Sequence, residues 1–463
     1  MNVDDLEQVF KALTKSTYVL SEQVLNVHKD LRNTLAELLL SSTTFEEVRS
    51  LEAQLWSVAF YRIIEGARSC LKKDKSILPK FLAFLSNSRD FYVEKLLLKL
   101  ESDLGHSLDS FIPSSLPLTI SLTKILFLCH RFFVILGDLE RYRTQVADDV
   151  SNFSISQSLY NQAIVVNPFV GYGYNQLAVI FYAHGNLLAS CYYYIRSFTC
   201  NEPFEKGLRN LKFVLETVKK SVNKKGIDVN DSSRAVQSFF TLFLLQLCVE
   251  FEELDRNTSG QSLDELFLIF NSNKIAEVVS EDIAQQVFGI LLYLIVEVNP
   301  KKNFVLTRFI TFMFENLLIS VNFPSILTLI CNILLLNSHF FSNYKVQIIA
   351  DLLRNILKSL SLPIGNSSEF LFSAIPFLPE QLNFRGFNII PSLATNVDFS
   401  TPSDDHEVDR KRIWSDCLDL LSNYCFKLSP GISERSGSVS DAEYISRSSS
   451  VVFDIDNDDL FHF

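Results

Sequence analysis

The amino-acid sequence predicts an all-α protein, in which a helical array is followed by a C-terminal helical-hairpin domain. Three observations support this fold class. Residues 121–146 carry apolar side chains at i, i+3, i+4 and i+7 throughout, as an amphipathic helix does. Residues 158–211 combine large and small residues at the spacing of packed helical hairpins. Residues 235–362 form apolar segments separated by short polar turns, without the period-two alternation of strands.

The N-terminal region predicts long helices. Residues 10–40 contain almost no helix breaker and carry apolar residues at helical spacing, so we expect one helix there. Residues 51–71 predict a second helix, and its apolar stripe consists of Trp56, Phe60, Ile63, Ile64 and Ala67. The prolines within residues 112–119 separate one helix from the helix of residues 121–146, because proline cannot continue a helix.

Residues 158–211 predict helical hairpins similar to tetratricopeptide units. The positions that match the large and small residues of this unit are Tyr174, Leu177, Ala178, Phe181, Gly185, Ser190, Tyr194 and Ser197. Gly185 supplies the turn between the two helices, because glycine tolerates the left-handed conformation that ends a helix. We expect the tyrosines at 192–194 to pack inside the hairpins and Arg196 to pair within the fold.

The polar segment 223–234 predicts a linker between two helical domains, residues 1–222 and residues 235–426. Within the second domain, residues 363–407 are rich in Pro, Asn, Ser and Gly and are expected to form loops, whereas residues 408–426 predict a last helix. The tail, residues 427–463, is rich in serine and acidic residues. It cannot form a core by itself and is expected to be disordered.

Composition favours an intracellular protein that does not enter the membrane. Of the 463 residues, 48% are hydrophobic, but the longest apolar runs, residues 288–296 and 325–336, are shorter than the roughly 20 residues that cross a bilayer. Acidic residues near the N-terminus argue against a signal peptide. The eight cysteines include no C-x-x-C pair and the seven histidines are dispersed. We therefore expect reduced thiols and no zinc site.

Charge and motifs argue against two broad functions. A net charge of −11 is unfavourable for a general nucleic-acid coat, because the affinity of such a protein comes from Lys and Arg that neutralise phosphates. The basic run Lys219, Lys220, Lys224 and Lys225 fits a solvated linker. The sequence contains no Gly-rich phosphate loop, no G-x-S-x-G and no H-E-x-x-H. We therefore expect neither an enzyme nor a cofactor.

Three ordered blocks within residues 51–211 resemble one protein family. They are LEAQLWSVAFYRIIEGAR (residues 51–68), LGDLERYR (136–143) and the segment 160–211, which contains YNQLA, YYYIRS, PF and NL. These blocks are similar to the Est-one/Smg family. That family comprises the telomerase-associated Est-one proteins, their yeast relative Ebs-one, and the Smg five, six and seven factors of nonsense-mediated mRNA decay. The remainder of the chain resembles the family only in being helical.

The resemblance implies a phosphoserine-binding groove of the 14-3-3 type, in which a phosphate lies between basic residues and a tyrosine. The dipeptide Arg141-Tyr142 matches one side of this groove. On the other side, the family's usual lysine is replaced by Tyr61. The neighbouring Arg62, or Arg68 two turns further along the same helix, is therefore expected to supply the positive charge.

Two further residues belong to this expected groove. By the same resemblance, Asn175 would hold the backbone of the bound peptide. Gly137, one turn before Arg141, is expected to leave open space beside it. Since Arg141 lies off the apolar stripe of its helix, we expect it to be exposed, so that Arg141→Glu would nearly abolish phosphoserine binding with little change in melting temperature.

Residue spacing also supports an alternative without any ligand. Arg62 and Arg68 each lie three residues from Glu65, and Arg141 lies three residues from Asp138. Side chains three apart on a helix are neighbours and form ion pairs. In that case the protein would be a purely structural helical scaffold.

The resemblance implies a non-enzymatic adaptor, cytoplasmic and/or nuclear. It would recognise a phosphorylated Upf-one-type RNA helicase, recruit decay factors and take a family member as heterodimer partner. Without the spaced carboxylates of a nuclease domain, the sequence is more similar to the Smg-seven/Ebs-one branch than to the Smg-six branch. The alternative is an Est-one-type telomerase subunit that binds telomerase RNA and a phosphorylated telomere protein.

Overall fold

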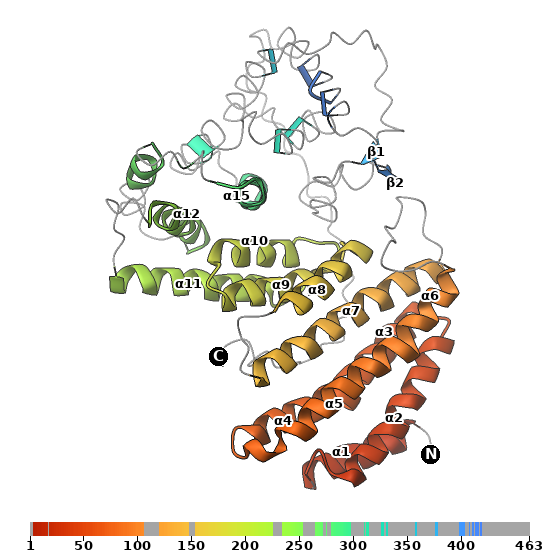
Figure 1. Ribbon diagram of the computed structural model, residues 1–463. Helices are drawn as coiled ribbons and strands as arrows, with labels where there is room; N and C mark the ends of the chain where they lie inside the picture. Colours follow the sequence, from red (N-terminus) through yellow and green to blue (C-terminus); the bar gives the residue numbers. More distant parts are fainter. Residues whose placement is uncertain are drawn as a thin grey trace, which may run out of the picture.

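The computed structural model describes residues 3–16, 18–105, 120–147, 153–225, 234–252, 264–271, 275 and 279–297, and short further stretches between 310 and 418. The helices of these residues follow one another through the molecule in chain order (Figure 1). Helices α1 to α6 form one end, α7 crosses above them, and α8 to α11 form the next layer. Helices α12 and α15 lie beyond that layer.

The helical elements have the following bounds. The first six helices are α1 (Val3–Ser16), α2 (Glu22–Ser41), α3 (Phe45–Gln54), α4 (Arg62–Leu71), α5 (Leu78–Phe91) and α6 (Leu98–Leu104). Two π-helical turns, η1 (Leu55–Tyr61) and η3 (Tyr92–Leu97), and the 3-10 turn η2 (Lys75–Ile77) lie between them. The later helices are α7 (Ile120–Val146), α8 (Ser154–Val166), α9 (Gly171–Ala183), α10 (Leu187–Phe198), α11 (Gly207–Lys225), α12 (Ala235–Glu252) and α15 (Glu281–Glu297).

The helical fold class is confirmed for the described residues, with one short exception. Strands β1 (Pro376–Phe377) and β2 (Asp398–Pro402) pair in parallel, within the segment that was expected to form loops. The helix expected over residues 121–146 is confirmed as α7, and the turn at Gly185 is confirmed by its φ of +73°. The described residues between 407 and 418 are helical, in agreement with the expected last helix.

The first two expected helices differ from the structure. Residues 10–40 do not form one helix, because α1 ends at Ser16 and α2 begins after Ser21. The Ser21 hydroxyl accepts a hydrogen bond from the Val24 backbone N–H at 3.4 Å, which is the geometry of a helix N-cap. The second helix begins earlier than expected, at Phe45, and contains the π-helical turn η1. Its predicted apolar stripe is confirmed as buried.

Helix α7 runs through the centre of the first hydrophobic core. It packs against α3, α5, α6, α8 and α9, and every residue from 125 to 142 is buried. A second core extends from α9 through α10, α11, α12 and α15. Helix α9 is shared, because Leu177 and Ile180 belong to the first core whereas Ala178 and Val179 belong to the second. The helices that surround α7 are therefore coupled directly to the second half of the protein.

The domain bounds 1–222, 223–234, 235–426 and 427–463 stay a prediction. Helix α11 continues to Lys225, beyond the first expected bound. Most of the expected linker, the break at residues 112–119 and the whole tail lie outside the described residues.

The tyrosines at 192–194 and Arg196 pack inside the fold, as expected. Arg196 is buried and donates hydrogen bonds to the hydroxyl oxygens of Tyr192 at 3.0 Å and Tyr174 at 2.8 Å. Tyr192 and Tyr194 are buried as well. A platform for stacking nucleic-acid bases requires exposed rings, so these tyrosines do not provide one.

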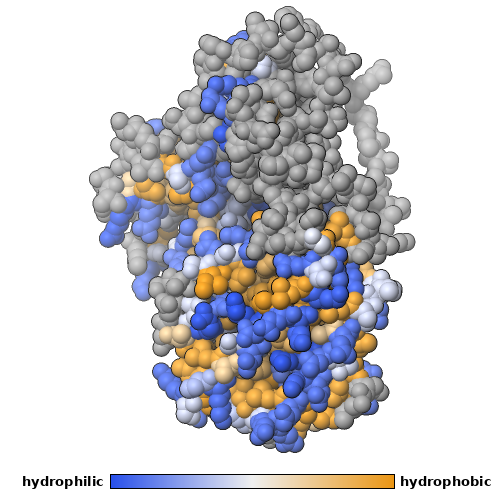
Figure 2. All heavy atoms as spheres, turned by 45° about the vertical axis from the view of Figure 1, so that its right-hand side comes forward, coloured by the Kyte–Doolittle hydropathy of each residue, from blue (hydrophilic) through white to orange (hydrophobic). Residues whose placement is uncertain are grey.

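No helix in the described part of the chain is long and apolar enough to cross a lipid bilayer. Figure 2 shows that, over the N-terminal helices, hydrophobic side chains reach this face in strips between hydrophilic ones. The seven described cysteines are free thiols, and all except Cys70 are buried. Burial raises the pKa of Cys129 to about 12, which keeps its thiol protonated.

Candidate functional site

Helices α4 and α7 bring Arg68, Arg141 and Tyr142 together. The guanidinium carbon of Arg68 lies 5.2 Å from the centroid of the Tyr142 ring, and that of Arg141 lies 4.7 Å from the same centroid. Both distances fall within the range of cation–π attraction. Two positive charges that are far apart in the sequence therefore meet at one aromatic ring.

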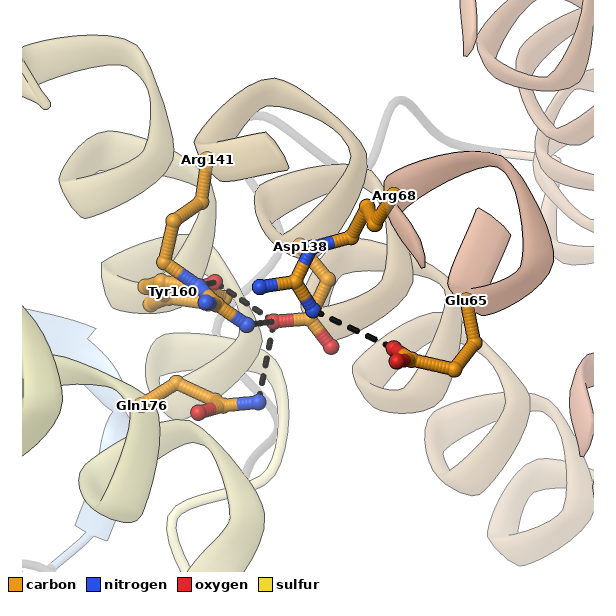
Figure 3. A network of polar contacts seen from close by, with 6 residues as sticks. All are labelled: Glu65, Arg68, Asp138, Arg141, Tyr160 and Gln176. Carbon is orange, nitrogen blue, oxygen red and sulfur yellow. Dashed lines mark hydrogen bonds and ion pairs between the residues drawn. The ribbon is translucent and has the colours of Figure 1, made fainter. Parts of the chain in front are cut away.

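The carboxylate of Asp138 holds Arg141 in place (Figure 3). Its Oδ1 accepts hydrogen bonds from Arg141 Nη2 at 3.2 Å, from the Tyr160 hydroxyl at 2.7 Å and from Gln176 Nε2 at 2.9 Å. Arg141 Nε also donates to the Tyr160 oxygen at 3.3 Å. These partners come from α7, α8 and α9, and the side chains of Arg141 and Asp138 are only 7% and 8% exposed. The guanidinium of Arg141 is therefore held directly by α7 and α8, and Gln176 of α9 holds the Asp138 carboxylate.

The protonation of Tyr160 follows from its surroundings. Burial raises the pKa of its hydroxyl well above the ordinary value, and the negative charge of Asp138 raises it further. The hydroxyl is therefore protonated at neutral pH. It donates its proton to Asp138 and accepts a hydrogen bond from Arg141, which links the two charged groups.

Arg68 forms the accessible side of the cluster. Its Nη1 donates to Glu65 Oε2 at 3.3 Å, and the two side chains are 16% and 47% exposed. Figure 3 shows Arg68 and Arg141 extending from two helices toward the region around the Asp138 carboxylate. The site thus combines a buried ion pair with one that faces solvent.

The structure does not bring Arg62 or Asn175 into this cluster. Arg62 begins α4, and its buried Nε makes no hydrogen bond within the described part of the chain. The buried Asn175 accepts a hydrogen bond from Asn210 Nδ2 of α11 at 3.0 Å. It is the next residue, Gln176, that reaches Asp138.

Two expectations about α7 are wrong. Arg141 is buried, not exposed, because α7 is surrounded by other helices and α8 covers the face that carries this arginine. Gly137 does not leave open space, because a Cβ there would lie 2.3 Å from Tyr160 Cε1. The glycine instead allows the Tyr160 ring to pack directly on α7. Sequence reasoning missed Tyr160 and Gln176, since only the packing of α8 and α9 brings them to Asp138.

Gly137→Ala is expected to destabilise the protein by about 1–3 kcal/mol, because the added methyl group overpacks against a fully buried ring. Alanine is favoured over glycine within a helix by up to about 1 kcal/mol, so the clash must exceed this gain. Urea unfolding of the two proteins measures the difference. A midpoint equal to or above that of the unmodified protein would show that Tyr160 is not held in this position.

Comparison with known proteins defines the family of this protein. Residues 156–428, more than half of the chain, match the family model described as the Est1 DNA/RNA binding domain. The chain therefore belongs to the EST1/SMG5–7 family, as the sequence blocks indicated.

Individual relatives are distant. The chain is 29% identical over 219 residues to the nonsense-mediated mRNA decay factor SMG7-like of Arabidopsis thaliana, covering 47% of this chain and 24% of the relative. It is 26% identical over 212 residues to the telomerase-binding protein EST1A of Danio rerio, covering 44% of this chain and 14% of the relative. The chain thus spans a quarter or less of these relatives. A chain in the crystal structure of Est1 and Cdc13 shares the fold, with a TM-score of 0.64, 12% identity and coverage of 90% and 96%.

Proposed function

We propose that the protein is a non-enzymatic adaptor that binds a phosphoserine peptide at Arg68, Arg141 and Tyr142. The observation that carries this proposal is the meeting of two guanidinium groups from separate helices at one tyrosine ring. A phosphoserine carries about −1.5 to −2 charge at neutral pH and accepts several charge-assisted hydrogen bonds. The planar fork of arginine matches two phosphate oxygens at once.

The hydrogen bonds of Arg141 leave donors for such a ligand. Its Nε and Nη2 donate to Tyr160 and Asp138, and among the residues that the structure describes its Nη1 has no hydrogen-bond partner. Arg68 is closer to solvent and supplies the second positive charge. Arg62 and Asn175, which lie outside the cluster, would contact the flanking peptide only after a rearrangement.

The cellular role that we propose is in nonsense-mediated mRNA decay, in the cytoplasm and/or nucleus. Relatives in plants and in vertebrates are named as decay factors SMG7-like, SMG7 and SMG5. The ligand would be a phosphorylated RNA helicase of the Upf-one type. The second half of the chain would then recruit decay factors, and a family member would form a heterodimer with it.

A telomerase-associated role is the second candidate. It is supported by the relative named as a telomerase-binding protein and by the family model described as binding DNA or RNA. In this role the ligands would be telomerase RNA and a phosphorylated telomere protein. Sequencing the RNA that co-purifies with the intact chain separates the two roles, because each predicts a different RNA class.

Binding of a fluorescent phosphoserine peptide, followed by anisotropy, tests the site itself. We expect the phosphorylated peptide to bind at least about tenfold more tightly than its unphosphorylated form, and Arg68→Gln to remove this difference. Arg143→Gln is a matched control, since Arg143 also pairs with an acid three residues away but is 50% exposed and outside the cluster. Equal affinity for both peptides would contradict the proposal.

A further inference from the structure

We propose that the two ion pairs of the site respond differently to a ligand. On binding, Arg68 exchanges Glu65 for the anionic group of the ligand, whereas Arg141 keeps Asp138 and Tyr160. Glu65 would then act as a built-in competitor that sets the affinity of the site, and Tyr160 as a positioning residue for Arg141. This inference rests on the proposed phosphopeptide function and adds its regulation.

The two pairs differ in their surroundings. The Asp138 carboxylate is 8% exposed and receives three hydrogen bonds on one oxygen, so breaking its pair with Arg141 would leave a buried charge without compensation. The Glu65 carboxylate is 47% exposed, and water can solvate it once Arg68 moves away. An exposed pair contributes little to stability and is easily exchanged. Only the pair of Arg68 with Glu65 is therefore suited to open.

Competition by Glu65 also bears on which ligands the site accepts. An incoming carboxylate would replace one carboxylate by another at Arg68, with no gain in charge. A phosphate brings about −1.5 to −2 charge and three acceptor oxygens, enough to engage Arg68 and the Nη1 of Arg141 together. The resident Glu65 therefore favours phosphate over the side chains of acidic residues in an unmodified peptide.

Tyr160 has the second role, which is to position Arg141. Its hydroxyl connects Arg141 Nε to Asp138 Oδ1, and its ring packs against Gly137. Tyr160→Phe keeps the ring and removes only the hydroxyl. Arg141 then loses the acceptor that orients its Nε, so its remaining donors are less well directed at a ligand.

The test uses the full chain and a fluorescent phosphoserine peptide. Glu65→Gln is expected to raise the affinity roughly two- to fivefold, the equilibrium factor that corresponds to an exposed ion pair. Glu216→Gln is a matched control: Glu216 is 45% exposed and pairs with Lys219, three residues away on α11, at 3.7 Å. This control removes the same charge far from the site, and the affinity is expected to stay unchanged.

A double-mutant cycle shows whether Glu65 acts through Arg68. In an Arg68→Gln background, Glu65→Gln is expected to have no effect, because the donor for which the two anions compete is absent. Tyr160→Phe is expected to lower the affinity at least about threefold, while circular dichroism shows a folded protein. If Glu65→Gln raises the affinity of the Tyr160→Phe variant by the same factor as that of the unmodified protein, the two residues act separately, Glu65 on Arg68 and Tyr160 on Arg141.

Several outcomes would overturn this inference. Unchanged or lower affinity in Glu65→Gln, or an equal gain in Glu216→Gln, would exclude competition at Arg68. Undiminished affinity in folded Tyr160→Phe would exclude the positioning role. If the unmodified protein binds the phosphorylated and unphosphorylated peptides equally well, the proposed function itself fails. This result does not depend on any of the variants.

Discussion

Replacing Arg141 with methionine is expected to destabilise the protein by about 3–5 kcal/mol, the cost of leaving one member of a buried ion pair without its partner. Methionine retains much of the length of arginine but no charge. Asp138 then keeps its hydrogen bonds from Tyr160 and Gln176 but loses the positive charge that compensates it. Arg141→Glu, which was expected from the sequence to change the melting temperature little, would be more destabilising still, because two carboxylates would then face each other.

Urea unfolding measures this effect, and two variants provide its controls. Arg143→Met removes an exposed arginine of the same helix. Its partner Glu140 keeps a second pair with Arg89 at 3.2 Å, so about 0–1 kcal/mol is expected for this variant. The double variant Arg141→Met with Asp138→Leu removes both charges, so it is expected to be more stable than Arg141→Met alone. If the single and double variants unfold at the same urea concentration as the original protein, the pair contributes nothing to the fold.

This cost decides which arginine should be used to test binding. A loss of peptide affinity in an Arg141 variant would mix unfolding with the loss of a ligand contact. Arg68 is closer to solvent and its carboxylate partner is exposed, so its replacement separates the two effects. Arg68 is therefore the residue to replace when peptide binding is measured.

Local sequence patterns predicted where the helices lie in the chain better than they predicted which helices pack around them. The apolar repeat of residues 121–146 predicted α7 almost to the residue, since helix formation depends on neighbours a few positions away. The same repeat marked Arg141 as exposed, because a stripe identifies the most apolar face and not the number of helices that pack around it. The burial of residues 125–142 depends on α3, α5, α6, α8 and α9, which are separate helices elsewhere in the sequence.

In the candidate site, too, contacts within one helix were predictable from the sequence and contacts between helices were not. The helical spacing of Asp138 and Arg141 made their ion pair predictable, and the stripe of α4 favoured Arg68 over Arg62. Tyr160 and Gln176 lie on other helices, and no spacing within α7 relates them to Asp138. The open space expected beside Gly137 was wrong for the same reason, since the ring of Tyr160 from α8 occupies it.

A second large effect is expected at the ion pair between Glu52 of α3 and Arg131 of α7. Arg131 Nε lies 3.0 Å from Glu52 Oε1, and both side chains are buried. The Arg131 guanidinium carbon also lies 4.3 Å from the centroid of the Tyr172 ring of α9. The pair therefore connects three helices across the first core, at a distance from the proposed phosphate site.

Arg131→Met is expected to cost about 3–5 kcal/mol near pH 8, because the Glu52 carboxylate would remain buried without a partner. Burial already raises the pKa of Glu52, and the charge of Arg131 opposes this rise. Without Arg131 the pKa of Glu52 rises further in the folded protein, whereas in the unfolded chain it stays near its ordinary value. A raised carboxyl pKa gives most stability at low pH, and this is lost as the pH rises through the folded pKa. The variant should therefore be less destabilised at pH 5 than at pH 8.

Urea unfolding of this variant at pH 5 and pH 8 measures both the size and the sign of the effect. The double variant Glu52→Leu with Arg131→Met removes the buried charges together and is expected to recover most of the stability and to lose the pH difference. Lys99→Met, which breaks the exposed pair of Lys99 with Asp103 at 2.8 Å, is the control, and a change of at most about 1 kcal/mol is expected for it. A loss in Arg131→Met that is equal at both pH values would show that Glu52 carries no buried charge. In that case the contact of Arg131 with Tyr172, and not its pairing with a charged Glu52, would hold the three helices together.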